Sequence, residues 1–219
     1  MFLRFLSQLR RQISHAPGTN PRIDFGAWNV DRLSAAWRSA WPFSHVVIDE
    51  LVPVSTLTAL SRAIDAEPHQ PNRGELYDMM GSAHTVTHPT LRAFHARLGS
   101  DEALAAVAAV TGKPVSKVVM RSFIYVNGSY LLPHTDHRHD LERRVAFAYY
   151  VHAAGNGGEL EFFDCTLAKS GEILETRPGV RLPSVSNRLV LFDVAPGSLH
   201  RVHEVLGGRR LSLSGWFYA

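Results

Sequence analysis

Residues 188–218 read RLVLFDVAPGSLHRVHEVLGGRRLSLSGWFY, and this stretch decides the fold. Two of its parts, 188–194 and 210–218, are runs of leucine, β-branched and aromatic residues bounded by Gly, Pro and Asn. Short runs of this kind between turn-forming residues are typical of β-strands. With a further short strand expected around His200, the stretch predicts three strands.

The run at 210–218 has two chemically different faces, because side chains alternate along a strand. One face is apolar and the other carries an arginine, two serines and a tryptophan: Arg210, Ser212, Ser214 and Trp216. In the run at 144–152 the same alternation places two alanines and one tyrosine together, Ala146, Ala148 and Tyr150. Small residues beside a tyrosine leave room for a ligand, although contact with solvent explains either face of a lone strand equally well.

Upstream of this stretch the chain divides into a helical part and a strand-rich part. Apolar spacing predicts helices at 54–66, 90–98 and 101–110, after a short strand at 45–52. From residue 117 onward we expect further strands at 118–126, 144–152, 158–163 and 172–176. Helices followed by strands indicate an α+β fold, with N-terminal helices backing one face of a double-sheet β structure.

The first 45 residues are predicted to pack on this core as a helix and connector. Residues 1–13 place Phe2, Phe5 and Leu9 on one helical stripe, and residues 15–43 are read as an irregular connector. Residues 46–219 then form a single domain. Within it, 72–89 shows no period and is predicted to be a functional loop.

Composition excludes several classes of protein. The formal charge is +3 at pH 7 without a basic tract, so a nucleic-acid partner is not expected. The single cysteine, Cys165, forms no intrachain disulfide, which suits a reducing cytoplasm. No run approaches the ~18 apolar residues that a membrane span needs, and the interrupted apolar stretch at the N-terminus is not typical of a signal peptide.

The segment LLPHTDHRHD at 131–140 carries a candidate metal site. His134 and Asp136 are two residues apart on an extended chain, so both can face one ion. A second histidine is available at His200 or His203. Two histidines and one carboxylate form the facial triad of non-haem iron oxygenases. From spacing alone, His137, His139 and Asp140 remain alternatives.

An arginine follows these histidines on the last predicted strand. Arg210 lies ten residues beyond His200, with Ser212 two residues further along, and Arg209 differs from it only in register. A dianionic co-substrate that chelates a metal through its 2-oxo acid end needs a cation for its far carboxylate. Arginine binds a carboxylate in a two-pronged geometry.

The order of these motifs resembles the prolyl 4-hydroxylase-like branch of the iron(II)/2-oxoglutarate-dependent dioxygenases, over about residues 120–217. The resemblance rests on Tyr125 and NGS ahead of PHTD, YYVH with GGELEFF after it, SNRLVLFDV, and SLHRVHEVLGGRRLSLSGWF. It implies a double-stranded β-helix, or jelly roll, with iron(II) at its open end. It also favours His134, Asp136, His200 and Arg210 over their alternatives.

The same resemblance implies the chemistry. Tyr125 and Tyr150 would hydrogen-bond 2-oxoglutarate beside Arg210, with Ser212 assisting. Oxygen is the other co-substrate, and succinate and carbon dioxide are the co-products. Family halogenases vacate the carboxylate position for chloride, so Asp136 indicates hydroxylation.

Substrate recognition is expected around the mouth of the site. The loop at 72–89, which includes Tyr77, and the turn at 137–144 are candidate lids, and Arg121 is predicted either to bind an acidic substrate group or to form a structural salt bridge. A small molecule is preferred as substrate, with a prolyl or other protein residue as the alternative. A rival from another class is a non-catalytic, cupin-like metal-binding jelly roll. The oligomeric state does not follow from the sequence.

Overall fold

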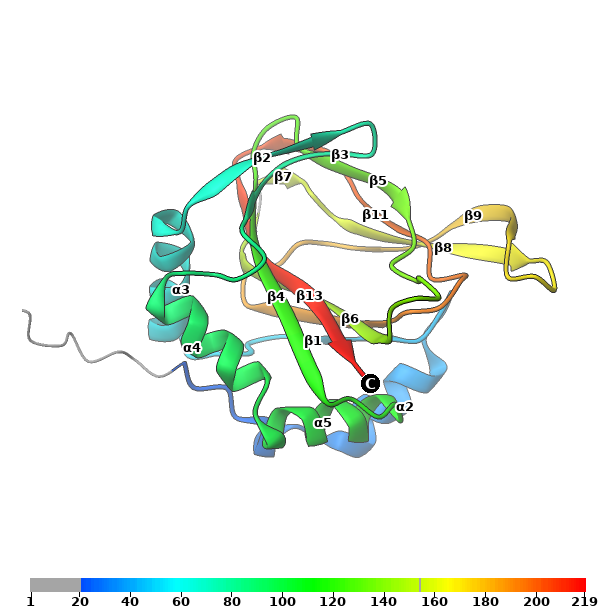
Figure 1. Cartoon of the computed structure of the whole chain (residues 1–219), viewed down its shortest axis with the longest axis horizontal. Coiled ribbons are helices and arrows are strands. Elements are labelled where there is room, and N and C mark those ends of the chain that lie inside the picture. The colour runs from blue at the N-terminus through cyan, green and yellow to red at the C-terminus, as the bar shows by residue number, and fades with distance from the viewer. Residues whose placement is uncertain (1–20, 154) are drawn as a thin grey trace, which may run out of the picture.

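The centre of the molecule is an antiparallel sheet that curls on itself, with helices along one side (Figure 1). The structure is a computed structural model that describes residues 21–153 and 155–219. Its helices are η1 (Phe25–Ala27), α2 (Val30–Ser39), α3 (Val54–Ala66), α4 (Pro89–Leu98) and α5 (Asp101–Thr111).

Within the described residues, eleven strands form the main sheet. They are β1 (His45–Ile48), β2 (His69–Gly74), β3 (Tyr77–Ser82), β4 (Lys117–Tyr125), β5 (Tyr130–His134), β6 (Arg143–His152), β8 (Leu160–Leu167), β9 (Ile173–Leu182), β10 (Arg188–Asp193), β11 (His200–Val202) and β13 (Arg210–Tyr218). Their order is β1-β10-β6-β13-β4-β3-β5-β11-β8-β9, with β2 paired to β3. A separate pair joins β7 (Asn156–Gly157) to β12 (Val205–Gly207).

Strand β13 lies in the middle of this order, between β6 and β4. In its ladders Arg210 is the partner of Tyr125 on β4, and Ser212 is the partner of Tyr150 on β6. The register therefore brings the four residues implicated in co-substrate binding onto three adjacent strands.

Side-chain alternation divides the buried residues into two clusters, one between sheet and helices and one inside the curl. Leu211, Leu213 and Phe217 of β13 belong to the first, together with Leu60 and Phe94 of the helices. Ala146, Ala148 and Tyr150 of β6 belong to the second. The predicted faces of both strands are therefore confirmed.

Local sequence explains where the helices begin and end. Leu91, Phe94 and Leu98 bury one side of α4, and Pro89 occupies its first turn, where a missing N–H costs nothing. Helix α5 begins after Ser100, whose hydroxyl accepts from the Ala103 N–H, and ends at Gly112 in the left-handed conformation. The predicted helix at 54–66 is confirmed at both ends, and those at 90–98 and 101–110 each extend one residue further.

Two predictions about irregular segments were wrong. The connector at 15–43 contains helix α2, which Asn29 caps by accepting from the Arg32 N–H, and which buries Trp37. The loop at 72–89 contains most of the β2–β3 hairpin. Its strands were missed because β2 is polar and largely exposed, so no alternation marks it.

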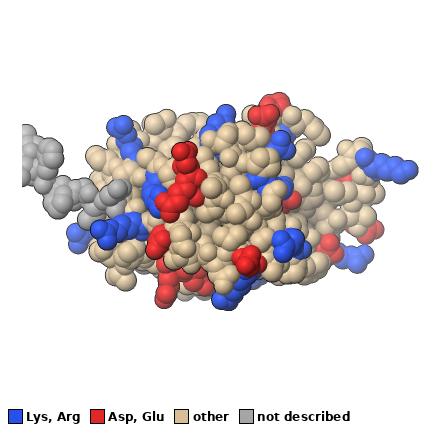
Figure 2. Space-filling model, turned by 90° about the horizontal axis from the view of Figure 1, so that it is seen from below, with Lys and Arg blue, Asp and Glu red and all other residues tan. Residues whose placement is uncertain are grey.

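Two expectations about the N-terminal part of the chain are not tested by the structure. The helical stripe at 1–13 lies outside the described residues, and the division of the chain at residue 45 stays a prediction. No helix in 21–153 or 155–219 is long and apolar enough to cross a membrane. On the face shown in Figure 2, basic and acidic side chains are interspersed.

Candidate metal and co-substrate site

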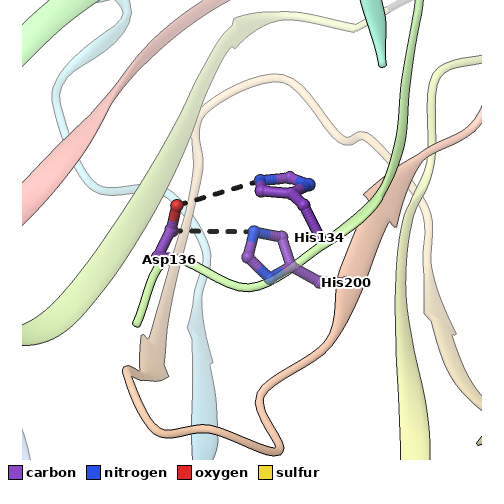
Figure 3. A group of neighbouring side chains, drawn as sticks. All are labelled: His134, Asp136 and His200. Carbon is purple, nitrogen blue, oxygen red and sulfur yellow. Dashed lines mark ion pairs between the residues drawn. The ribbon is translucent and has the colours of Figure 1, made fainter. Parts of the chain in front are cut away.

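Three side chains from neighbouring parts of the sheet converge on one point (Figure 3). His134 is the last residue of β5, His200 is the first of β11, and the two are cross-strand partners. The ligand atoms of His134, Asp136 and His200 all lie within 4.8 Å of one another. Asp136 Oδ1 is 3.8 Å from His134 Nε2, and Asp136 Oδ2 is 3.6 Å from His200 Nε2.

Backbone carbonyls orient both imidazoles. Nδ1 of His134 lies 2.9 Å from the Leu132 carbonyl oxygen, and Nδ1 of His200 lies 3.0 Å from that of Ser198. A carbonyl only accepts, so each Nδ1 carries a proton and Nε2 is the ring nitrogen that can offer a lone pair. Such hydrogen bonds fix the tautomer of metal-binding histidines.

Electrostatics also suit a metal ligand at residue 200. Burial lowers the pKa of His200 to about 4, although the Asp136 carboxylate opposes this shift. The imidazole is therefore neutral at pH 7 and free to donate its lone pair. Two imidazoles and a carboxylate on one side of an ion match the donor set that non-haem iron(II) takes, with further positions left for exogenous ligands.

The alternative ligands are engaged elsewhere. His203 Nε2 lies 2.9 Å from Glu161 Oε2, and Asp140 forms an exposed ion pair with Arg138. His137 and His139 pack edge to face on each other. None of these four belongs to the group that could hold an ion.

Arg210 is buried beside this group, with only 2% of its surface exposed. Its Nη1 donates to the Gly158 carbonyl at 3.0 Å. Its Cζ lies 4.7 Å from the ring centroid of Tyr125 and 4.6 Å from that of Tyr150, so the guanidinium is held between two aromatic faces. Arg209, by contrast, pairs with Asp65 at the surface.

Four buried polar atoms on β6 and β13 lack a hydrogen-bond partner within the described part of the chain: Tyr150 Oη, Arg210 Nε and Ser212 Oγ, which lie close together, and Trp216 Nε1, which lies six residues further along β13. Each such atom costs about 1–3 kcal/mol when it is left unsatisfied. Burial raises the pKa of both Tyr125 and Tyr150, so their hydroxyls stay protonated and can donate. Donors gathered around a buried cation fit the carboxylate of 2-oxoglutarate.

A cavity of about 440 Å³ connects these parts. Its walls include the three candidate ligands, Arg210 and Tyr125, and also the two residues predicted to contact substrate, Tyr77 and Arg121. Tyr150 and Ser212 are fully buried. They do not line the cavity but lie behind its wall, where Tyr150 packs on Arg210 and is the cross-strand partner of Ser212.

Sequence reasoning missed one contact at the site. Arg143 Nη1 donates to the Asp136 carbonyl at 3.2 Å, and its Cζ lies 3.7 Å from the Trp216 ring centroid. Trp216 shares its strand face with Arg210, and this alternation could have indicated that Trp216 also faces the site. Arg143 lies in the predicted turn at 137–144, but no residue pattern indicates that its side chain turns back to the Asp136 carbonyl.

Comparison with known proteins identifies this region. Residues 120–218 match the family described as the 2OG-Fe(II) oxygenase superfamily. This part of the chain is similar to that superfamily. The matched range contains all seven residues predicted to bind metal or co-substrate. The expected set of iron(II), 2-oxoglutarate and oxygen is confirmed at the level of the family.

Individual relatives agree with this assignment. A prolyl 3-hydroxylase, OGFOD1 of Mus musculus, is 42% identical over 96 residues, which are 40% of this chain and only 16% of that protein. A prolyl-4-hydroxylase of Pseudomonas putida superposes with a TM-score of 0.65 at 21% identity, covering 85% of this chain and 98% of that one. The carbocyclase SnoK from nogalamycin biosynthesis gives 0.67 at 12% identity, covering 90% and 86%. These neighbours confirm the predicted jelly-roll core.

Proposed function

We propose that the chain is an iron(II)- and 2-oxoglutarate-dependent dioxygenase that hydroxylates an unactivated C–H bond. The observation that carries this proposal is that the metal-binding group and Arg210 open into one cavity. A cupin-like module that holds a structural ion has no use for a buried arginine surrounded by unsatisfied donors. That arrangement favours the enzyme over the non-catalytic alternative.

Each residue has a definite part in this function. Iron(II), 2-oxoglutarate and oxygen, when bound, supply oxidation of a C–H bond coupled to decarboxylation of 2-oxoglutarate to succinate. His134, Asp136 and His200 would hold the metal from one side. Arg210 would bind the far carboxylate of 2-oxoglutarate.

Neighbouring side chains orient these groups. Tyr125, Tyr150 and Ser212 surround the carboxylate position with hydroxyl groups. Arg143 fixes the backbone of Asp136 through its bond to the carbonyl and its stacking on Trp216. Apolar walls such as Leu131 and Phe192 exclude water from the reacting centre.

A small molecule is our first candidate for the substrate. The cavity volume of about 440 Å³ lies within the range of small-molecule sites, roughly 300–1,000 Å³. A prolyl residue of a protein is the second candidate, supported by the local similarity to OGFOD1, named as a prolyl 3-hydroxylase. Both substrates would use the same metal and co-substrate residues.

Succinate release tests the proposal. We expect succinate to form only when iron(II), oxygen and 2-oxoglutarate are all present. Its formation should be slow without a prime substrate and faster with one. A screen of small molecules and of proline-containing peptides, followed by detection of a 16-dalton mass gain, separates the two candidates. His134→Ala and Asp136→Ala should abolish succinate formation, and full turnover by either variant would refute the assignment.

A further inference from the structure

Arg121 lines the cavity at a point separate from Arg210. It lies on β4, where its ladder partner is Ser214, whereas Arg210 faces Tyr125 four residues further along the same strand. At roughly 3.3 Å per residue, the two backbone positions are about 13 Å apart. The lumen therefore has an arginine at each of two levels, and the second is not needed for 2-oxoglutarate.

The Arg121 guanidinium is held in place by neutral groups. Its Nε donates to the Ser82 carbonyl at 3.0 Å, and its Nη2 donates to the same oxygen. Its Cζ lies 5.2 Å from the Phe123 ring centroid. Gly81 gives it room, since a Cβ there would approach Nη2 to 2.9 Å.

Arg121 forms no salt bridge with any carboxylate in the part of the chain that the structure describes, which argues against the structural salt bridge that the sequence left open. Half-burial without a counter-charge lowers the pKa of its guanidinium, and desolvation is the main cause. Its remaining donors are the two N–H groups of Nη1 and one of Nη2. A partly desolvated cation gains most from an anion that enters the cavity with it.

The charged residues that line the cavity also favour an anionic substrate. Among the described residues that line it, three are arginines, Arg121, Arg143 and Arg210, and one is a carboxylate, Asp136. Iron(II) and the 2-oxoglutarate dianion carry equal and opposite charges. Counting only the arginines and the carboxylate, three cations against one anion leave a surplus of two positive charges in the loaded cavity, which attracts anions.

We propose that Arg121 selects a prime substrate that carries a carboxylate, held at the Ser214 level of the lumen while the target C–H bond faces the metal. This inference rests on the proposed function and adds its substrate class. The carboxylate belongs either to a free small acid or to an acidic residue beside the target residue in a peptide. The chemistry at Arg121 is the same in both cases.

Matched acids and amides test this directly. The panel pairs 2-amino acids with their 2-amino amides, and proline-containing tetrapeptides that carry Glu with the same peptides carrying Gln beside the proline. Binding to the chain loaded with Mn(II) and 2-oxoglutarate is measured by ligand-observed NMR, and succinate release is measured with iron(II). We expect one arm to show acids favoured over amides by roughly tenfold to a hundredfold.

Three variants separate charge from structure. Arg121→Gln keeps a donor for the Ser82 carbonyl but removes the charge, and should abolish the preference for acids. Arg121→Lys keeps the charge and should retain part of it. Arg92→Met removes an exposed arginine on α4 and should leave the preference intact. Melting temperatures verify that each variant is folded.

The outcomes decide the matter in either direction. Acids that bind no better than amides, including no binding by either, overturn the assignment, as does an unchanged preference in Arg121→Gln. Binding of 2-oxoglutarate, measured in the same samples, is independent of Arg121. If the unmodified chain does not bind 2-oxoglutarate, the proposed function itself is refuted.

Discussion

Arg210→Met should weaken 2-oxoglutarate binding far more than it lowers the free energy of unfolding. The arginine is buried and lies between two tyrosine rings, with Nε unpaired within the described residues. Removing one partner of a buried charged pair costs about 2–5 kcal/mol, which at 1.4 kcal/mol per factor of ten is roughly a 30-fold to 4,000-fold loss of affinity.

The effect on stability should be small because two terms oppose each other. The substitution removes a buried unpaired cation, which favours folding. It also deprives the Gly158 carbonyl of its donor, which costs about 1–3 kcal/mol. Arg210→Lys keeps the charge but not the planar fork, so an intermediate loss of affinity is expected.

Calorimetric titration of 2-oxoglutarate into the Mn(II)-loaded chain measures the effect, and Mn(II) titration of the same samples checks the metal site. Arg209→Met is the matched control, since Arg209 pairs with Asp65 at the surface and this ion pair contributes about 0–1 kcal/mol. Wild-type affinity for 2-oxoglutarate in Arg210→Met, with metal binding intact, would show that the guanidinium does not bind the co-substrate.

Three further predictions follow from the same geometry. Asp136→Ala should lose Mn(II) binding in a titration, while His203→Ala should keep it. The opposite result would show that His203 is a ligand and Asp136 is not. Gly157→Ala should lower the free energy of unfolding in urea by about 2 kcal/mol or more, because φ is 78° and a Cβ would overlap the Glu204 carbonyl oxygen; an unchanged midpoint would contradict the backbone described here. Burial lowers the pKa of His69, so the unfolded chain takes up the proton first as the pH falls below about 6.5. The contribution of His69 to stability is therefore complete above that pH and is lost as the pH falls through the pKa of His69 in the folded chain. We expect the urea midpoint to decrease when the pH is lowered from 7.5 to 5.5, and to decrease less in His69→Gln. An equal decrease in both proteins would show that His69 is not responsible.

Much of the β core could be predicted because burial leaves a regular pattern in the sequence. Strand β13 has the expected bounds, and its alternation places Leu211 and Leu213 in the cluster under the helices and leaves the buried polar residues Arg210 and Ser212 outside that cluster. The metal-binding segment could be found because His134 and Asp136 are close in sequence. Placing His200 with them required the family resemblance.

The missed features share a physical cause. Helix α2 carries an Asn29 cap and a buried Trp37, but the Pro, Gly and Trp around it hid its period. Strand β2 is mostly exposed, so its residues lack an apolar face, and its pairing with β3 supplies what its composition does not. The contact of Arg143 with the Asp136 carbonyl joins residues seven apart, and it depends on the conformation of the turn between them, which no residue pattern marks.

The cross-strand pairing of His134 with His200 has a consequence for assembly of the sheet. A shift of β11 by one residue would turn the second imidazole outward and present Arg201 in its place, because successive side chains point to opposite faces. An ion that prefers two imidazoles would then bind only the correctly aligned sheet. Metal binding would thus stabilise the correctly aligned sheet over the shifted one. At a free metal concentration of a hundred times the dissociation constant, the aligned state would be favoured by about 2.7 kcal/mol.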